Sequence, residues 1–168
     1  GERGNLTRAL RETAEFDSKI LVEQKIDARE IEVAVLGNDE PMAAAPGEIV
    51  MSEGTAYYDY ETKYFSDTDS EARIPADLPE ETAEMFRQLA LRAYMALGVS
   101  GLARVDFFLT RADGTIYINE INNLPGFTAI SLYPKAFQPA GMELPELVTK
   151  LIDYAAERHD SQLRRESV

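Results

Sequence analysis

The sequence contains no cysteine and no tryptophan, and His159 is its one histidine. Without cysteine the chain can form neither a disulfide framework nor a thiolate metal site. The histidine lies in a charged stretch close to the last residue, away from any other nitrogen or sulfur ligand. Thiol chemistry and zinc chemistry are therefore excluded.

Basic residues are scarce as well. The sequence has 17 lysines and arginines and 30 aspartates and glutamates, which gives a formal net charge of -13. Most of the surface would repel nucleic acid and anionic membranes, so we expect neither as a partner. The apolar runs are far shorter than the roughly 20 residues that span a bilayer, and residues 1–20 lack the apolar core of a signal peptide. We expect a cytoplasmic protein.

What is present is enough for one globular domain over residues 1–168. Hydrophobic residues make up 45% of the chain and charged residues 28%, which is typical of a soluble protein with a closed core. No internal repeat or linker divides the sequence. The order of the expected elements predicts an α+β fold, an antiparallel sheet with helices packed on one side.

Hydrophobic periodicity locates these elements. A helical period predicts helices over 5–16, 79–97 and 143–158, with a short helix over 134–140. Apolar or alternating runs predict strands over 19–24, 30–36, 102–110 and 115–121. Residues 54–70 mix aromatic and charged residues without a sustained period and predict a long surface loop. The last ten residues are expected to form a charged tail.

The hairpin formed by the last two strands can close in two registers. A two-residue loop, Asp113-Gly114, would set Asp106 opposite Ile121 and put charge on both faces of the hairpin. A three-residue loop over 112–114, with the glycine left-handed, would set Asp106 opposite Glu120. Phe108 would then face Ile118, and Arg104 would face Asn122.

We favour the second register because it separates polar from apolar side chains. One face then carries Arg104, Asp106, Glu120 and Asn122. The other face carries an apolar stripe that can join the core, namely Ala103, Val105, Phe107, Leu109, Tyr117 and Ile121.

Two facing carboxylates repel each other unless a cation lies between them. The oxygen donors of Asp106, Glu120 and Asn122 suit Mg²⁺ or Mn²⁺, and magnesium commonly accompanies phosphates. The alternative is that Asp106 pairs with Arg104 or Arg111 and that Glu120 is only solvated. Spacing alone leaves both interpretations open.

Four segments carry a resemblance to a known family. They are GLARVDFFLTRADGTIYINEINNLPGFTAISLYPKAF, ILVEQKIDAREIEVAVLG, PGEI and YYDYETKYFSD. Together with the last amphipathic helix they resemble, in order and over about residues 6–157, the carboxy-terminal part of bacterial D-alanine–D-alanine ligases, which are ATP-grasp enzymes. The resemblance implies ATP-dependent joining of two D-alanines through an acyl phosphate, for peptidoglycan precursors. It also implies that the family's amino-terminal domain and much of its central domain have no counterpart here, so we expect the chain alone to lack full activity. A homodimer is compatible with the complete enzyme.

The resemblance also implies roles for single residues. The nucleotide-binding residues would be Glu23, Gln24 and Ile26 at the adenine, Glu30 at the ribose, Tyr57 over the adenine, and Lys63 at the phosphates. Tyr64 would anchor the loop that closes over the site. Arg104 and the backbone N–H of Gly126 would stabilise the tetrahedral intermediate, while Ser131 and Leu132 would receive the carboxylate of the incoming D-alanine. The implied cofactors are ATP and two Mg²⁺ or Mn²⁺ ions, held by Asp106, Glu120 and Asn122.

Two other functions fit parts of this pattern. The first is a different ATP-grasp ligase, which would join a carboxylate to another amine or to a hydroxy acid. The second is a binding module whose acidic hairpin holds only a structural cation such as calcium.

Overall fold

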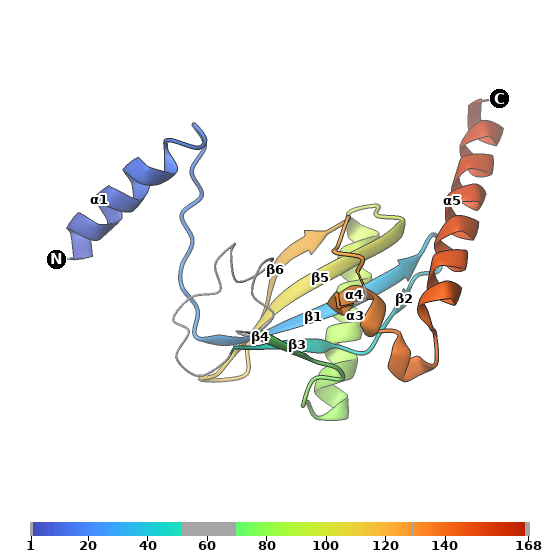
Figure 1. The fold of residues 1–168 in the computed structure, drawn as a ribbon, viewed down its shortest axis with the longest axis horizontal. Helices are drawn as coiled ribbons and strands as arrows, with labels where there is room; N and C mark the ends of the chain where they lie inside the picture. The colour runs from blue at the N-terminus through green and yellow to red at the C-terminus, as the bar shows by residue number, and fades with distance from the viewer. Residues whose placement is uncertain (1, 52–69, 129, 167–168) are drawn as a thin grey trace.

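An antiparallel sheet organises the chain. The computed structural model describes residues 2–51, 70–128 and 130–166 (Figure 1). The strands follow the order β4-β3-β1-β5-β6, and β2 pairs with β1 outside this path. Their bounds are β1 Ala28–Gly37, β2 Met42–Ala43, β3 Gly47–Met51, β4 Ser70–Arg73, β5 Gly101–Thr110 and β6 Ile116–Asn122. The α+β class and the antiparallel sheet that the sequence predicted are confirmed.

The helices are α1 Glu2–Thr13, α3 Glu80–Ala96, α4 Leu132–Lys135 and α5 Leu144–Glu166, with a 3-10 turn, η1, at Gln138–Ala140. Helix α3 has the predicted ends. It follows Pro79, carries Glu80 and Glu81 in its first turn, where the helix dipole favours negative charge, and is followed by Gly98 with φ +62°. None of the helices in the described part of the chain is long and apolar enough to cross a membrane.

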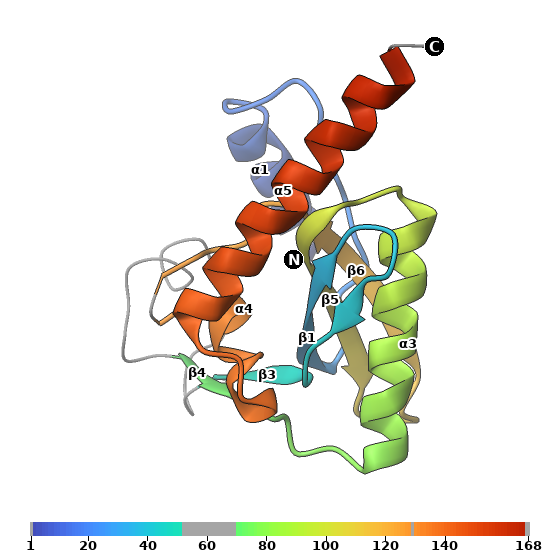
Figure 2. The same cartoon turned by 90° about the vertical axis from the view of Figure 1, so that its right-hand side faces the viewer.

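The helices cover both faces of the sheet, whereas the sequence predicted one. On β1, Ile31, Val33 and Val35 pack in the cluster that includes α3. Ala34 and Leu36 point to the opposite face and pack in the cluster that includes α4 and the start of α5. Figure 2 shows α3 on one side of the strands and α5 on the other. The second half of β1 is buried on both faces, so alternation could not reveal which side the helices cover.

The predicted strand over 19–24 is wrong. Residues 19–27 have no regular secondary structure, and Leu21 and Val22 are 79% and 67% exposed. An apolar run forms a strand only when a neighbouring strand satisfies its backbone, and within residues 2–51, 70–128 and 130–166 no strand pairs with this segment. Helix α1 also begins earlier than predicted, at Glu2, and ends at Thr13.

The predicted charged tail is helical instead. Helix α5 continues without a break to Glu166. Its lysine, arginine, glutamate and glutamine residues are good helix formers, so the polar end of the helix needs no core contact to stay helical. The short helix predicted over 134–140 is divided between α4 and η1. Most of the predicted loop over 54–70 lies outside the described residues.

The β5–β6 hairpin has the favoured register at its polar end. Arg104 pairs with Asn122 and Asp106 with Glu120, as predicted. Nearer the turn the pairing changes by one residue, so Phe108 faces Tyr117 rather than Ile118.

The hairpin loop is one residue longer than predicted, and a bulge in the strands compensates for the extra residue. The loop has four residues, 111–114, closed by the Thr110 N–H donating to Thr115 O at 2.9 Å, and Gly114 has φ +71°. A bulge between Asp106 and Phe107 then restores the predicted pairing. As a result Tyr117 is 47% exposed and does not join the predicted apolar stripe. Ile116 packs against the core instead.

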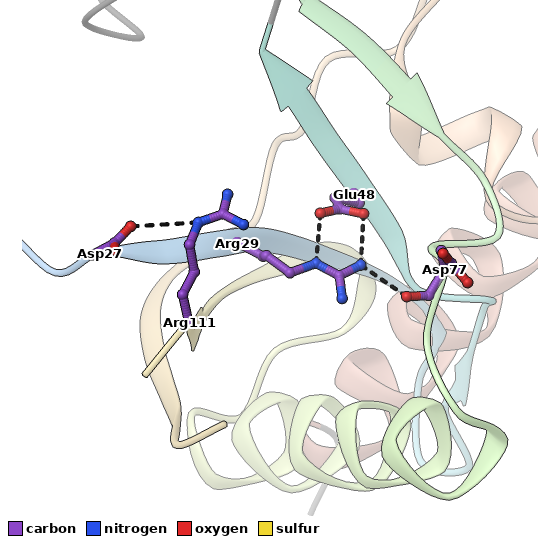
Figure 3. Close-up of polar contacts among 5 residues, drawn as sticks. All are labelled: Asp27, Arg29, Glu48, Asp77 and Arg111. Atoms are coloured by element: carbon purple, nitrogen blue, oxygen red, sulfur yellow. Dashed lines mark hydrogen bonds and ion pairs between the residues drawn. The ribbon is translucent and has the colours of Figure 1, made fainter. Parts of the chain in front are cut away.

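An arginine–carboxylate pair links β1 to β3 on the face of the sheet that carries Ile31 and Val33 (Figure 3). Arg29 on β1 donates two hydrogen bonds of 2.7 Å to Glu48 on β3, and a third of 2.9 Å to the carbonyl of Asp77. The side chains of Arg29 and Glu48 are 24% and 10% exposed. The hydrogen bonds from Arg29 hold the pKa of Glu48 below its ordinary value of 4.5.

The stability contribution of this pair should depend on pH. Because the pKa of Glu48 is lowered by folding, its contribution is complete above the unfolded pKa and is lost as the pH falls through the folded value. At pH 7, Glu48→Gln should lower the free energy of unfolding by about 1.5 to 3 kcal/mol, because a charged hydrogen-bond acceptor is lost. Urea unfolding from pH 7 to pH 3 should show the difference from the unsubstituted chain shrinking below pH 4.5. A constant difference would contradict this explanation.

Candidate active site

Three carboxylates form a row across the sheet. Glu32 on β1 pairs with Asp106 on β5, which pairs with Glu120 on β6. In the next row Arg104 pairs with Asn122. Side chains two residues apart on a strand share a face, so this alternation gathers the polar groups that the sequence predicted to lie together.

Arg104 binds two of these carboxylates at once. Its Nε and Nη2 donate to the two oxygens of Asp106 at 2.7 and 2.8 Å. The same Nε lies 3.0 Å from Glu32 Oε2. The three side chains are only 10 to 18% exposed.

The protonation of Arg104 follows from these contacts. Burial by itself would lower the pKa of Arg104, but the hydrogen bonds to Asp106 and the negative charges of Glu32 and Glu120 raise it well above its ordinary value. The guanidinium is therefore a permanent positive charge in this face. The pairing of Asp106 with Arg104, which spacing left open as an alternative, is present, whereas Arg111 approaches Asp27 at 3.4 Å.

The donor set fits a divalent metal by its chemistry. Glu32, Asp106 and Glu120 bring three formal negative charges against the positive charge of Arg104, and Asn122 adds an amide oxygen. In the described part of the chain no three Asp, Glu, His or Cys side chains are already arranged around a common metal position. Both oxygens of Asp106 bind Arg104. A metal ion would therefore have to share Asp106 with the arginine.

The loop that follows β6 carries the residues predicted to bind the incoming D-alanine. Asn122 Oδ1 accepts a 3.1 Å hydrogen bond from the N–H of Leu124, which starts the loop. Ser131 closes it, since its Oγ accepts from Thr128 N at 3.0 Å. A Cβ on Gly126 would lie 3.2 Å from that Oγ, so glycine permits the close approach. Leu132, which begins α4, is 6% exposed.

The predicted adenine residues lie in the segment that leads into β1 (Figure 1). Glu23 and Gln24 are exposed and Ile26 is half-buried. Glu30 lies within β1, two residues before Glu32 and on the same face. The structure brings Glu30 to the polar face, whereas the other three precede the sheet.

Tyr57, Lys63 and Tyr64 lie outside the described residues. Their roles therefore stay predictions.

Glu32 is the residue that sequence reasoning missed. It is 8% exposed and contacts Arg104 directly. Part of the signal was present, because in EIEVAVL the acidic residues Glu30 and Glu32 alternate with Ile31 and Val33, which puts both carboxylates on one face of their strand. The pairing of β1 with β5 makes this the face of Asp106.

Comparison with known proteins decides the family. The family described as "D-ala D-ala ligase C-terminus" matches residues 2–153. The chain belongs to this family. The resemblance seen in the sequence is thereby confirmed.

Members of the D-Ala-D-Ala ligase family match along nearly the whole chain. A D-alanine–D-alanine ligase of Acetivibrio thermocellus is 50% identical over 163 residues, which are 97% of this chain and 43% of that protein. The chain spans less than half of the length of this relative.

Solved ligase structures share the fold. The D-alanine–D-alanine ligase of Coxiella burnetii has a TM-score of 0.82 and 36% identity, over 96% of this chain and 41% of the other. The VanG D-Ala:D-Ser ligase of Enterococcus faecalis has a TM-score of 0.77 and 35% identity, over 90% and 43%. The ligase of Bacillus anthracis, complexed with ATP, has a TM-score of 0.75 and 29% identity, over 94% and 49%.

Proposed function

We propose that the chain is the carboxy-terminal part of an ATP-dependent D-alanine–D-alanine ligase that makes D-alanyl-D-alanine for peptidoglycan precursors in the cytoplasm. The observation that carries the proposal is the shared face of Arg104, Asp106, Glu120 and Asn122 on β5 and β6. Family membership supports it. The first D-alanine site would need residues from elsewhere in the complete enzyme.

The chain would hold the nucleotide and its metal along this face. Asp106, Glu120 and Asn122 would bind two Mg²⁺ or Mn²⁺ ions, which neutralise phosphate charge and polarise the transferring phosphoryl group when bound. Glu23, Gln24 and Ile26 would surround the adenine, and Glu30 would accept hydrogen bonds from the ribose hydroxyls. Tyr57 would cover the base, Lys63 would reach the phosphates, and Tyr64 would anchor the closed loop.

Arg104 would act on the reacting carbonyl. The amine of the second D-alanine attacks the acyl phosphate, and negative charge develops on the carbonyl oxygen before phosphate leaves. A fixed, charged fork of N–H donors stabilises that oxyanion without reorganising during the reaction. The backbone N–H of Gly126 would donate to the same oxygen, and Ser131 with Leu132 would orient the incoming carboxylate.

A D-serine acceptor is the second candidate. The similarity to the VanG D-Ala:D-Ser ligase is almost as high as that to the Coxiella enzyme. Both acceptors use the same ligation chemistry and differ by one hydroxyl. Competition between D-alanine and D-serine at equal concentration would separate the two candidates.

A chimeric ligase tests the proposal. The 168-residue chain would replace the matching carboxy-terminal part of the Acetivibrio thermocellus ligase, to which it is 50% identical. The chimera should release phosphate from ATP only when D-alanine and magnesium are present, and mass spectrometry should detect D-alanyl-D-alanine. Asp106→Asn is the matched control, because it removes a proposed metal ligand and should abolish turnover.

Calcium binding without ligase activity would point to a different function. A folded chimera that binds calcium but shows neither magnesium-dependent ATP affinity by calorimetry nor phosphate release would contradict the ligase. It would favour the cation-binding module.

A further inference from the structure

Glu32 occupies an electrostatically unfavourable place. It pairs with Asp106 across β1 and β5, and each residue is 8% exposed. Like charges directly opposite each other on neighbouring strands repel, and a buried carboxylate costs free energy unless a cation pairs with it. A residue kept in such a place needs a compensating contact, and Arg104 provides it.

The contact fixes one edge of the arginine. Nε donates its hydrogen bond to Asp106 Oδ1 at 2.7 Å and Nη2 donates to Asp106 Oδ2 at 2.8 Å. The same Nε forms an ion pair with the buried Glu32 Oε2 at 3.0 Å, which is not a hydrogen bond. A guanidinium is planar and has five N–H donors. Holding the Nε edge against two carboxylates directs its remaining donors away from them.

The two carboxylates differ in what else they can bind. Asp106 neighbours Glu120 on β6, whereas Glu32 is separated from β6 by the whole of β5. No three acidic, histidine or cysteine side chains in residues 2–51, 70–128 and 130–166 are grouped as a metal site, so Glu32 does not complete one with Asp106 and Glu120. A metal ion at Asp106 would compete for its oxygens with Arg104. The contact between Glu32 and Nε would not be affected.

We infer that Glu32 is a positioning residue that holds the Arg104 guanidinium in its working orientation while Asp106 binds the metal. The inference rests on the proposed function for its catalytic consequence. The contact between Glu32 and Arg104 can be tested without it. Glu32 acts through Arg104 and touches neither ATP nor D-alanine in this assignment.

Kinetics of the chimeric ligase test the consequence. Glu32→Ala should lower kcat about 10- to 100-fold, the usual loss when a supporting contact of an active site is removed, with little change in the KM for ATP. Glu32→Gln should lose less, because it keeps the size of the side chain and an oxygen beside Nε while losing the charge of the ion pair. Glu48→Gln is the matched control. It removes a buried partner of an arginine from the strand next to β1, on the opposite face, and should leave kcat unchanged.

A double substitution separates positioning from general destabilisation. If Glu32 acts through the guanidinium, Glu32→Ala should reduce kcat little further in an Arg104→Lys background. An equal loss in both backgrounds would overturn the inference. The inference would also be overturned if Glu32→Ala left kcat unchanged, or if Glu48→Gln lowered kcat by the same factor as Glu32→Ala.

NMR of the 168-residue chain tests the contact itself. The Arg104 Nε–H resonance should be protected from exchange with water, and should stay protected when magnesium chloride and ATP are added. In Glu32→Ala that protection should be lost on the same addition, and unchanged protection would overturn the inference. An unsubstituted chimera without turnover contradicts the proposed function, whereas an active chimera that tolerates Glu32→Ala contradicts only the role of Glu32.

Discussion

Arg104→Lys in the chimeric ligase should lower kcat about 100- to 1000-fold, equivalent to about 2.7 to 4 kcal/mol of lost transition-state stabilisation, as when an oxyanion donor is deleted. Lysine keeps the charge but replaces a planar fork by a single ammonium group. The fork of Arg104 contacts Glu32 and both oxygens of Asp106 simultaneously. One ammonium group cannot keep these contacts and also donate in a fixed direction to an oxyanion.

Steady-state kinetics and calorimetry would measure this effect, and ATP affinity should change little. Arg29→Lys is the matched control, since Arg29 also binds a carboxylate with two N–H groups, on the opposite face of the same strand β1. It should cost stability but not turnover. A chimera with Arg104→Lys that keeps near-normal turnover and loses nucleotide affinity would show that Arg104 only neutralises the acidic row.

Phe86→Ala should remove a large part of the stability of the fold. Phe86 is 0% exposed on α3, and its ring meets that of Phe107 edge-on at 5.2 Å and 73°. Truncating a fully buried phenylalanine costs about 3 to 5 kcal/mol, because apolar contact is lost and a cavity remains. Domains of this size are stabilised by only about 5 to 15 kcal/mol.

Urea unfolding of the 168-residue chain, followed by circular dichroism, would measure the change. Met85→Ala is the matched control, because the neighbouring Met85 is 51% exposed on the same helix. It should change the free energy of unfolding by no more than about 0.5 kcal/mol. Similar losses in the two variants would mean that α3 does not form the core of this face.

Sequence patterns predicted the features that local rules control. Helix α3 has the predicted ends because Pro79, two glutamates and Gly98 act on their own neighbours. The polar end of the β5–β6 hairpin has the predicted pairing, since only one of the two registers separates charge from apolar side chains. The resemblance supplied the family and the implied roles, and the matching family confirms the former.

The failures concern strand pairing, which side-chain alternation does not reveal. Residues 19–24 have the composition of a strand, but nothing in that composition says whether another strand lies beside them. Tyr117 was assigned to the core because a bulge between Asp106 and Phe107 cannot be seen in an alternating pattern. Both errors arise because the periodicity of one segment carries no information about the strand that pairs with it.

By itself, therefore, the sequence determined the antiparallel hairpin, the register of Asp106 and Glu120, and the type of each long helix. These depend on side-chain alternation and on backbone preferences within a few residues. Only the tertiary structure decided that helices cover both faces and that Glu32 shares Arg104 with Asp106. Glu32 and Arg104 are 72 positions apart in the chain, and they meet because β1 and β5 pair along their whole length. Such a contact arises from strand pairing, which no local pattern in either segment encodes.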